Sequence, residues 1–298
     1  MQNLKPSTAN GYQTLWQSYL TLRLSRIIVR DFRTVDAGSL LAQIHREHEL
    51  GRTTLKHIKS FLSGVFTYAK NQGAYDGVNP IRDAMIPKKA AKPLETYAAS
   101  PDEVLAMMEA LDKAGEPKAG AAVALMFFAG LRPGEARGVC WEDFDGRRMQ
   151  VRRSVWHTHA SSPKTEGSAK PVPVIEPLNT TLSALRALDK NPVSGPILRG
   201  PSGKPLDLNN LASRVVIPTL KAAGIEWHGW YALRRGVATA ISVLSKGSLA
   251  AKGLLRHSNV STTERHYIKD VPENTLLAME QLEALCKDRS KPEGIKPS

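Results

Sequence analysis

Cysteine, long apolar runs and acidic residues are all scarce in this chain of 298 residues. Only Cys140 and Cys286 occur, without CxxC spacing, which argues against a disulfide scaffold, a zinc finger or an iron–sulfur site and favours a reducing compartment. The longest charge-free apolar run, residues 119–131, is shorter than the roughly 20 residues of a membrane span and predicts a buried helix. The N-terminus carries no secretory signal, so the predicted location is cytoplasmic.

Acidic residues number 28 against 41 Lys and Arg, which gives a net charge of +13. Residues 1–99 contain 14 basic and 7 acidic side chains, and the remaining residues contain 27 and 21, so both parts of the chain are basic. A basic surface shared between two domains favours a polyanionic partner such as nucleic acid. Charge alone leaves open a basic surface that binds nothing.

The first third of the chain predicts a small helical domain, residues 1–93. Apolar residues recur at helical spacing over 12–20 and 55–69, and between them Asp36 is a candidate cap for a helix. The segment 87–93, PKKAAKP, predicts an extended basic linker. The candidate phosphate-binding residues of this domain and its linker are Arg52, Lys56, Lys59, Lys88 and Lys89. A solvated basic face explains them equally well.

The second predicted domain spans residues 96–286, and a disordered tail, 287–298, follows it. Ser100 is a predicted N-cap, and a short helix is expected after Pro133. A hairpin is predicted over 141–155 with a type I′ turn at Asp145-Gly146, and a further strand over 171–175. Helical patterns then dominate to the end. The fold class is therefore mainly α with a small antiparallel β-sheet: a helical domain followed by an α+β domain.

Four segments of the second domain carry the candidate chemistry: GLRPGEA (130–136), SPKTEGSAKPVPV (162–174), WYALRRGVAT (230–239) and LLRHSNVSTTERHY (254–267). In order and approximate spacing they resemble the tyrosine recombinase, or phage integrase, family. The resemblance covers almost the whole chain. It implies that the first domain is the SAM-like core DNA-binding domain and that the second is the catalytic domain.

The resemblance implies that Arg132 is the first catalytic arginine, supported by Glu135, and that Lys164 is the general acid. Pro133 disfavours helix at Arg132, which places that residue at a helix junction. A planar guanidinium matches a phosphate with two parallel hydrogen bonds. A lysine in a polar loop is usually only solvated, and Lys170 is a nearby competitor for the role of acid.

Arg234 resembles the second arginine of the family's HxxR box, in which the usual histidine is here Tyr231. A phenol can still donate a hydrogen bond to a phosphate oxygen, but it cannot replace histidine as an acid–base group near neutral pH. His228 is a candidate substitute, although a histidine between two tryptophans is more often packed.

His257 resembles the family's later His/Trp position, and Tyr267 is the predicted nucleophile. Ser261 and Glu264 have the spacing of a capping box for the helix that would carry Tyr267. Tyr267 follows His257 by ten residues, whereas many relatives place the tyrosine nine residues after; here that position is His266, which is not a phenol.

The implied function is site-specific DNA cleavage and rejoining through a 3′-phosphotyrosyl intermediate, for integration or excision of a mobile element, without a cofactor or metal. The implied partners are double-stranded DNA and further copies of the chain, in a homo-tetramer on paired DNA sites. An accessory directionality factor is a further implied partner, and no membrane partner is expected. The alternatives are a type IB topoisomerase and a catalytically silent DNA-binding protein. A C-terminal apolar stripe from Leu276 to Cys286 is expected to link protomers; the alternative is docking on its own domain.

Overall fold

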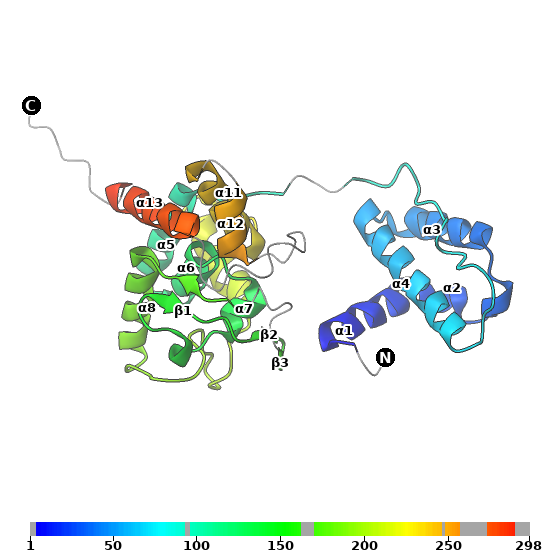
Figure 1. Cartoon of the computed structure of the whole chain (residues 1–298), viewed down its shortest axis with the longest axis horizontal. Coiled ribbons are helices and arrows are strands. Elements are labelled where there is room, and N and C mark those ends of the chain that lie inside the picture. Colours follow the sequence, from blue (N-terminus) through cyan, green and yellow to red (C-terminus); the bar gives the residue numbers. More distant parts are fainter. Residues whose placement is uncertain (1–3, 93–95, 162–169, 246–247, 257–272, 290–298) are drawn as a thin grey trace, which may run out of the picture. The chain divides into compact units, whose positions relative to one another are not determined.

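The computed structural model describes residues 4–92, 96–161, 170–245, 248–256 and 273–289. The chain divides into two compact units, residues 1–95 and 96–298. Both units are mainly helical, and the described strands form two small antiparallel pairs in the second unit (Figure 1). The predicted fold class is confirmed. None of the described helices is long and apolar enough to span a membrane.

The described part of the N-terminal unit, residues 4–92, contains four α-helices with short irregular turns. They are α1 (Pro6–Leu15), continued by the π-helical η1 (Trp16–Leu20), then α2 (Thr21–Leu24), the 3-10 turn η2 (Val29–Asp31), α3 (Thr34–His48) and α4 (Arg52–Asn71). Its core is formed by the apolar stripes of α3 and α4 together with Leu20 and Phe32. The helical spacing predicted for this third of the chain is confirmed.

Two details of the N-terminal unit differ from expectation. Asp36 stands in the first turn of α3, where its carboxylate accepts from the backbone N–H of Arg33 at 2.8 Å; it caps the helix from within and is not its N-cap residue. Part of the predicted linker, residues 87–93, packs against the N-terminal unit. Ala90 is buried in this unit's core, and the Ala91 carbonyl accepts from the backbone N–H of Arg52 at 2.8 Å. The small side chains of the segment PKKAAKP allow this packing.

The C-terminal unit surrounds a helix that is buried on all sides. The elements are α5 (Pro101–Lys113), α6 (Pro117–Phe128), α7 (Pro133–Gly138), the 3-10 turn η3 (Trp141–Asp143), β1 (Arg148–Met149), β2 (Ser154–Trp156), β3 (His159–Ser161), β4 (Val172–Pro173), α8 (Glu176–Leu188), α9 (Leu208–Leu211), the π-helical η5 (Ala212–Val216), α10 (Ile217–Ala222), α11 (Trp230–Leu244), α12 (Ser248–Leu255) and α13 (Glu273–Arg289). Helices α5, α8 and α11 pack against α6, which is buried from Ala119 to Phe128. The apolar run therefore forms the predicted buried helix.

Capping residues define where the first helices of this unit begin. Ser100 caps α5: its Oγ accepts from the Glu103 N–H at 3.2 Å, and the Glu103 carboxylate accepts from the Ser100 N–H at 2.7 Å. Pro133 opens α7, as predicted. Gly130 ends α6 with a φ of 56°, in the left-handed region that glycine adopts without strain.

The predicted hairpin over 141–155 is only partly correct. Its first strand is mostly the 3-10 turn η3, with one bridge between Phe144 and Met149, and Asp145-Gly146 is not a type I′ turn because only Gly146 has a positive φ (91°). Two separate pairs form instead: β1 with β4, and β2 with β3. The strand predicted over 171–175 is confirmed as β4. Strands of two or three residues leave too short an alternating pattern to assign partners from sequence.

The C-terminal helix α13 begins at Glu273 and packs on its own unit. Met279, Leu282 and Cys286 are buried, and α13 lies against α11, α12 and α8 (Figure 1). Leu276, Leu277 and Leu285 remain partly exposed. In this chain α13 therefore docks on its own domain, which was the alternative to the expected link between protomers. The predicted disordered tail begins inside α13 at residue 287, and residues 290–298 lie outside the described part of the chain.

Candidate active site

Arg132 lies at the sharp junction between α6 and α7. Its backbone is extended (φ −72°, ψ 154°), as expected before a proline, and it is the N-cap residue of α7. A Cβ atom added to Gly130 would lie 3.0 Å from Leu255, so the junction passes close to the end of α12. The side chain of Arg132 is 31% exposed and can reach a ligand.

Glu135, one turn into α7, is the centre of a buried charge cluster. Its Oε2 accepts from the backbone N–H of Arg132 at 2.9 Å, and its Oε1 accepts from Nη1 of Arg132 at 2.8 Å. Only 4% of its side chain is exposed. Burial alone would raise the pKa of this carboxyl, but the positive charge of Arg256 and the contacts from Arg132 outweigh burial and hold the pKa below its usual value. Glu135 is therefore a permanent anion at neutral pH.

Arg234 is buried in the first turns of α11 and connects two helix ends. Its Nη1 donates to the Gly130 carbonyl at the end of α6, and its Nη2 donates to the Leu255 carbonyl at the end of α12, at 2.8 Å. Cationic groups are favourable at helix C-termini. Burial and then the charge of Arg132 lower the pKa of Arg234 to about 10, so the side chain remains protonated at neutral pH.

Arg256 completes the cluster directly after α12. Its Nη2 donates to Oε2 of Glu135 at 2.8 Å, and its side chain is fully buried. The backbone φ of 54° is left-handed, which costs a residue with a Cβ roughly 1–2 kcal/mol. The sequence analysis did not single out this residue. The signal was a charged side chain at the end of the apolar segment LLR, where burial requires a partner.

A cavity of about 510 Å³ opens beside this cluster. The residues lining it are Thr96, Ala98, Arg132, Tyr231, Arg234, Arg235, Ala238, Thr239 and Leu255. Its lining contains three guanidinium groups and no carboxylate among the described residues, so it is suited to an anion. Tyr231 is 53% exposed and is one of the lining residues. Among the described residues there is no cluster of three His, Cys, Asp or Glu side chains that could hold a metal.

No protein-family model matches the chain. A tyrosine recombinase XerC-like protein of Caldanaerobacter subterraneus subsp. tengcongensis is 26% identical over 94% of this chain and 78% of its own length. The chain is therefore similar to a tyrosine recombinase over almost its whole length. A lambda integrase dimer bound to a COC′ core site shares the fold with a TM-score of 0.64 at 19% identity, over 90% of this chain and 93% of that one. The Tn1549 transposon integrase bound to transposon right end DNA has a TM-score of 0.70 at 17% identity, over 94% and 95%.

The structure brings together half of the tyrosine recombinase residues expected from sequence. Arg132, Arg234 and Tyr231 line one cavity, and Glu135 lies behind it. The other expected residues and the alternative nucleophile position lie outside the described part of the chain: Lys164, His257, Tyr267 and His266. Lys170, the competitor of Lys164, precedes β4 and is half-buried.

His228 is packed and does not line the cavity. Its ring stacks on Tyr97 with the centroids 3.7 Å apart and the planes at 19°. Its Nε2 lies 3.8 Å from a carboxylate oxygen of Glu226. The Tyr97 hydroxyl also donates a hydrogen bond to the Glu103 carboxylate, and this bond raises the pKa of the Tyr97 phenol. These contacts favour the packed interpretation of His228 over a role as substitute for the histidine that Tyr231 replaces.

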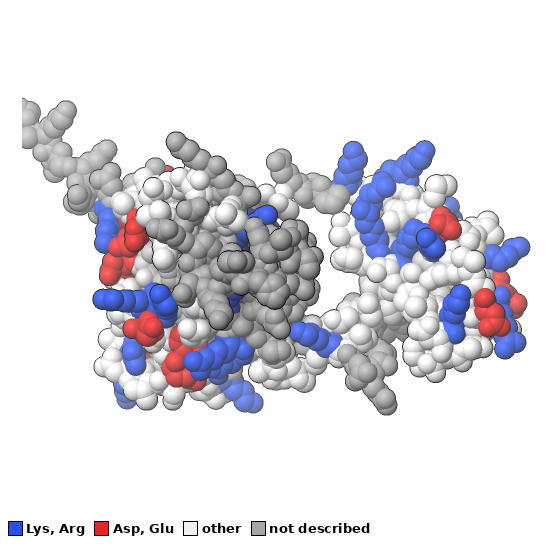
Figure 2. Space-filling view, viewed as in Figure 1, with Lys and Arg blue, Asp and Glu red and all other residues white. Residues whose placement is uncertain are grey.

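The basic residues expected to bind DNA in the N-terminal unit differ in accessibility. Lys56, Lys88 and Lys89 are exposed. Lys59 is half-buried, and its Nζ donates to the Ala84 carbonyl at 2.6 Å, which ties α4 to the segment that follows. Figure 2 shows several basic side chains on the upper part of this unit, and acidic and basic side chains together at its outer edge and on the C-terminal unit.

Proposed function

We propose that this protein is a site-specific DNA recombinase that cleaves and rejoins DNA strands through a 3′-phosphotyrosyl intermediate. The observation that carries the proposal is the convergence of Arg132 and Arg234, from different helices, on one anion-binding cavity. A phosphodiester gathers negative charge in its transition state, and fixed guanidinium groups stabilise that charge without a metal. The two arginines are separated by about 100 positions in the sequence, so this convergence is a property of the fold.

In the proposed reaction, the Tyr267 oxygen attacks the scissile phosphorus as the phenolic proton leaves to a base. The bond from phosphorus to the 5′ oxygen breaks, and Lys164 donates a proton to that oxygen. Tyr231 and His257 donate hydrogen bonds to the phosphate. Attack by a 5′-hydroxyl of another strand reverses these steps and frees Tyr267. The energy of the broken phosphodiester is conserved in the phosphotyrosine.

The proposed substrate is duplex DNA carrying a specific site, and the proposed assembly is four protomers on two sites. One relative of the same fold is a lambda integrase tetramer bound to a Holliday junction, with a TM-score of 0.65, which supports this assembly. The Tn1549 relative supports a mobile element as the source of the DNA. An accessory protein that sets the direction of exchange is a further proposed partner, and the protein would act in the cytoplasm, on DNA held there.

The test is covalent capture on a nicked DNA duplex from which the cleaved end diffuses away, in excess EDTA. The wild-type protein is expected to form a covalent complex, and Tyr267→Phe is expected to bind DNA equally well without forming one. His266→Ala is the matched control and is expected to retain capture. Loss of capture in His266→Ala but not in Tyr267→Phe would move the nucleophile.

The products distinguish the rival functions. Exchange of flanking sequences between two duplexes indicates recombination, whereas relaxation of supercoils without exchange indicates a topoisomerase. DNA binding without covalent capture by the wild-type protein would indicate a silent DNA-binding protein.

A further inference from the structure

Arg256 is the one member of the buried charge cluster that neither lines the cavity nor was expected from sequence. It stands at the junction after α12 with its side chain fully buried and its backbone in the left-handed region. Its N–H donates to the Gly253 carbonyl at 3.2 Å, which closes the last turn of α12. A glycine would satisfy this backbone conformation better. The arginine therefore has to be explained by its side chain.

The guanidinium of Arg256 shares one carboxylate with Arg132. Oε2 of Glu135 accepts from Arg256 Nη2 at 2.8 Å and from the Arg132 N–H at 2.9 Å, while Oε1 accepts from Arg132 Nη1 at 2.8 Å. Arg234 Nη1 lies 3.9 Å from Oε2. The cluster thus contains one anion and three cations. A carboxylate fixed from two sides cannot rotate, and each cation it contacts is only partly neutralised.

This division of charge has a consequence for Arg132. A guanidinium has five N–H donors, and Glu135 accepts from one of those of Arg132. Arg132 lines the cavity, and its other side-chain donors have no hydrogen bond among the described residues. A carboxylate held by Arg132 alone could swing to accept two of its donors, as isolated arginine–carboxylate pairs commonly do. Arg256 opposes that movement.

We propose that Arg256 is a positioning residue for Arg132, which acts by fixing the Glu135 carboxylate so that the Arg132 guanidinium presents its free donors to the scissile phosphate. The inference rests on the proposed function for the identity of the ligand, and it adds a second charged residue behind the catalytic arginine. It also assigns a role to the left-handed backbone at Arg256: that conformation directs the side chain back towards α7.

The first test is a double-mutant cycle on the single-turnover rate of covalent capture. Arg256→Gly is expected to lower the rate roughly 10–100-fold at unchanged DNA affinity, since small displacements of a catalytic group have effects of that size. Arg256→Lys, which keeps the charge, is expected to fall between Arg256→Gly and wild type. In a Glu135→Gln background, Arg256→Gly is expected to lower the rate no further if the effect of Arg256 on Arg132 passes through Glu135.

A backbone control separates charge from backbone strain. Lys190 has a φ of 65° and is exposed on the surface of the same unit, away from the cavity. Lys190→Gly relieves a similar strain and is expected to leave the rate of capture unchanged. If Arg256→Gly fails to fold because Glu135 loses one of its two ion-pair partners at 2.8 Å, the Arg256→Gly, Glu135→Gln double variant, which removes both charges, is compared with Glu135→Gln alone.

A second readout does not depend on catalysis. The charged groups that face Glu135 among the described residues are Arg132, Arg234 and Arg256, so removal of Arg256 is expected to raise the pKa of Glu135. The carboxyl carbon of Glu135, assigned in the ¹³C spectrum by its loss in Glu135→Gln, should titrate at higher pH in Arg256→Gly, while Lys190→Gly leaves it unchanged.

The outcomes separate the inference from the proposed function. Two results would overturn the inference and leave the recombinase function intact, provided that the wild-type protein forms the covalent complex. One is full activity of Arg256→Gly, and the other is a double variant whose capture rate is lowered by the product of the two single effects. Absence of capture by the wild-type protein would overturn the function, and the ¹³C titration would then decide alone whether Arg256 holds Glu135. An unshifted titration in Arg256→Gly would overturn that link.

Discussion

At the scale of single residues, the site depends on a small number of buried charges that balance one another. Burial lowers the pKa of Arg234 and Arg256, and the Glu135 carboxylate opposes that effect on both. Removal of one partner of a buried ion pair leaves the other charge unpaired, which is more costly than the pair itself is worth. The cluster is therefore sensitive to the loss of its only carboxylate among the described residues.

Glu135→Gln is expected to lower the free energy of unfolding by about 3 kcal/mol at neutral pH. The folded-state pKa of Glu135 is lowered, so its contribution is fully present above the unfolded value of about 4.3 and is lost as the pH falls through the folded pKa. The difference between wild type and variant should therefore shrink on acidification below about pH 4. Chemical denaturation from pH 3 to pH 7 measures it.

The matched control for this prediction is Glu109→Gln. Glu109 pairs with Lys113 one turn along α5, at 2.6 Å, and both side chains are exposed. Solvent screens such pairs, so this variant should unfold within experimental error of wild type at all pH values. A Glu135→Gln variant that behaves like the control would show that the buried cluster does not stabilise the unit.

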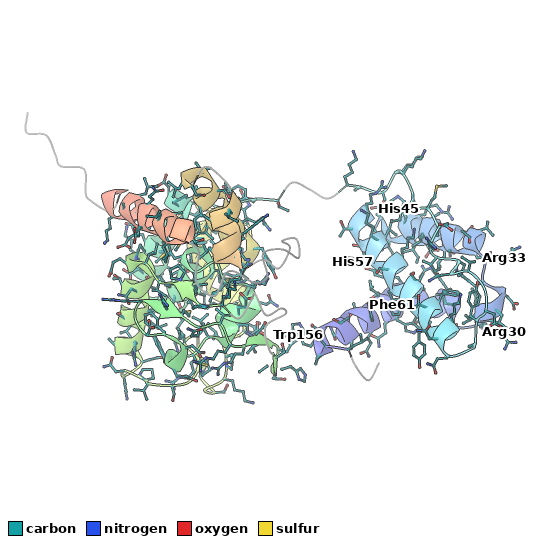
Figure 3. All side chains as sticks on the ribbon, in the orientation of Figure 1. Arg30, Arg33, His45, His57, Phe61 and Trp156 are labelled. Atoms are coloured by element: carbon teal, nitrogen blue, oxygen red, sulfur yellow. The ribbon has the colours of Figure 1, made fainter. Side chains whose placement is uncertain are left out.

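At the scale of elements, α7 is held against β2 by close backbone contact. A Cβ added to Gly138 would lie 2.5 Å from the Arg153 carbonyl oxygen, and one added to Gly134 would lie 2.5 Å from Ser154 Oγ. Arg137 adds hydrogen bonds from its Nη2 to the His157 carbonyl and from its Nε to the Leu206 carbonyl, both at 2.8 Å. The β2–β3 hairpin, in which Trp156 (Figure 3) is the last residue of β2, is thus fixed to the helix that carries Glu135.

Gly138→Ala is expected to lower the free energy of unfolding by about 1–3 kcal/mol, because a carbonyl in the strand segment cannot move without shifting the hairpin. Gly134→Ala should cost less, since the Ser154 side chain can rotate away. Gly120→Ala within α6 has no atom within 4 Å of the added carbon and should stabilise the unit by about 0.5–1 kcal/mol. Urea denaturation of the three variants gives this order; equal losses in Gly138→Ala and Gly134→Ala would contradict it.

Sequence reasoning succeeded where local rules dominate and failed where distant segments meet. The cap at Ser100, the buried helix α6 and the junction at Arg132 follow from capping, apolarity and proline sterics over a few residues. The pairing of β1 with β4 and the ion pair of Arg256 with Glu135 join residues far apart in the chain. No local pattern encodes such pairs. Arg256 in addition occupies a conformation that its own side chain disfavours.

At the scale of the whole molecule, the two units each have their own core, so under the proposed function each can carry a different part of the DNA contact. The N-terminal core is formed by α3 and α4, and the C-terminal core surrounds α6. The residues that line the cavity all belong to the second unit. Under the proposed function the chemistry therefore belongs to the second unit, and exposed basic residues of the first, such as Lys56 and Lys89, are proposed to bind the DNA backbone.

The final prediction concerns whether α13 stabilises its own chain or a neighbouring copy. Leu282 is fully buried against its own unit, whereas Leu277 on the same helix is 51% exposed. Leu282→Ala is therefore expected to lower the free energy of unfolding by about 2–4 kcal/mol, and Leu277→Ala by less than about 0.5 kcal/mol. For an intramolecular contact the urea midpoint of both variants and of wild type should not depend on protein concentration. If α13 instead docked on a second copy, the wild-type midpoint would rise with concentration, because association then adds to stability by mass action, and Leu282→Ala would abolish that dependence.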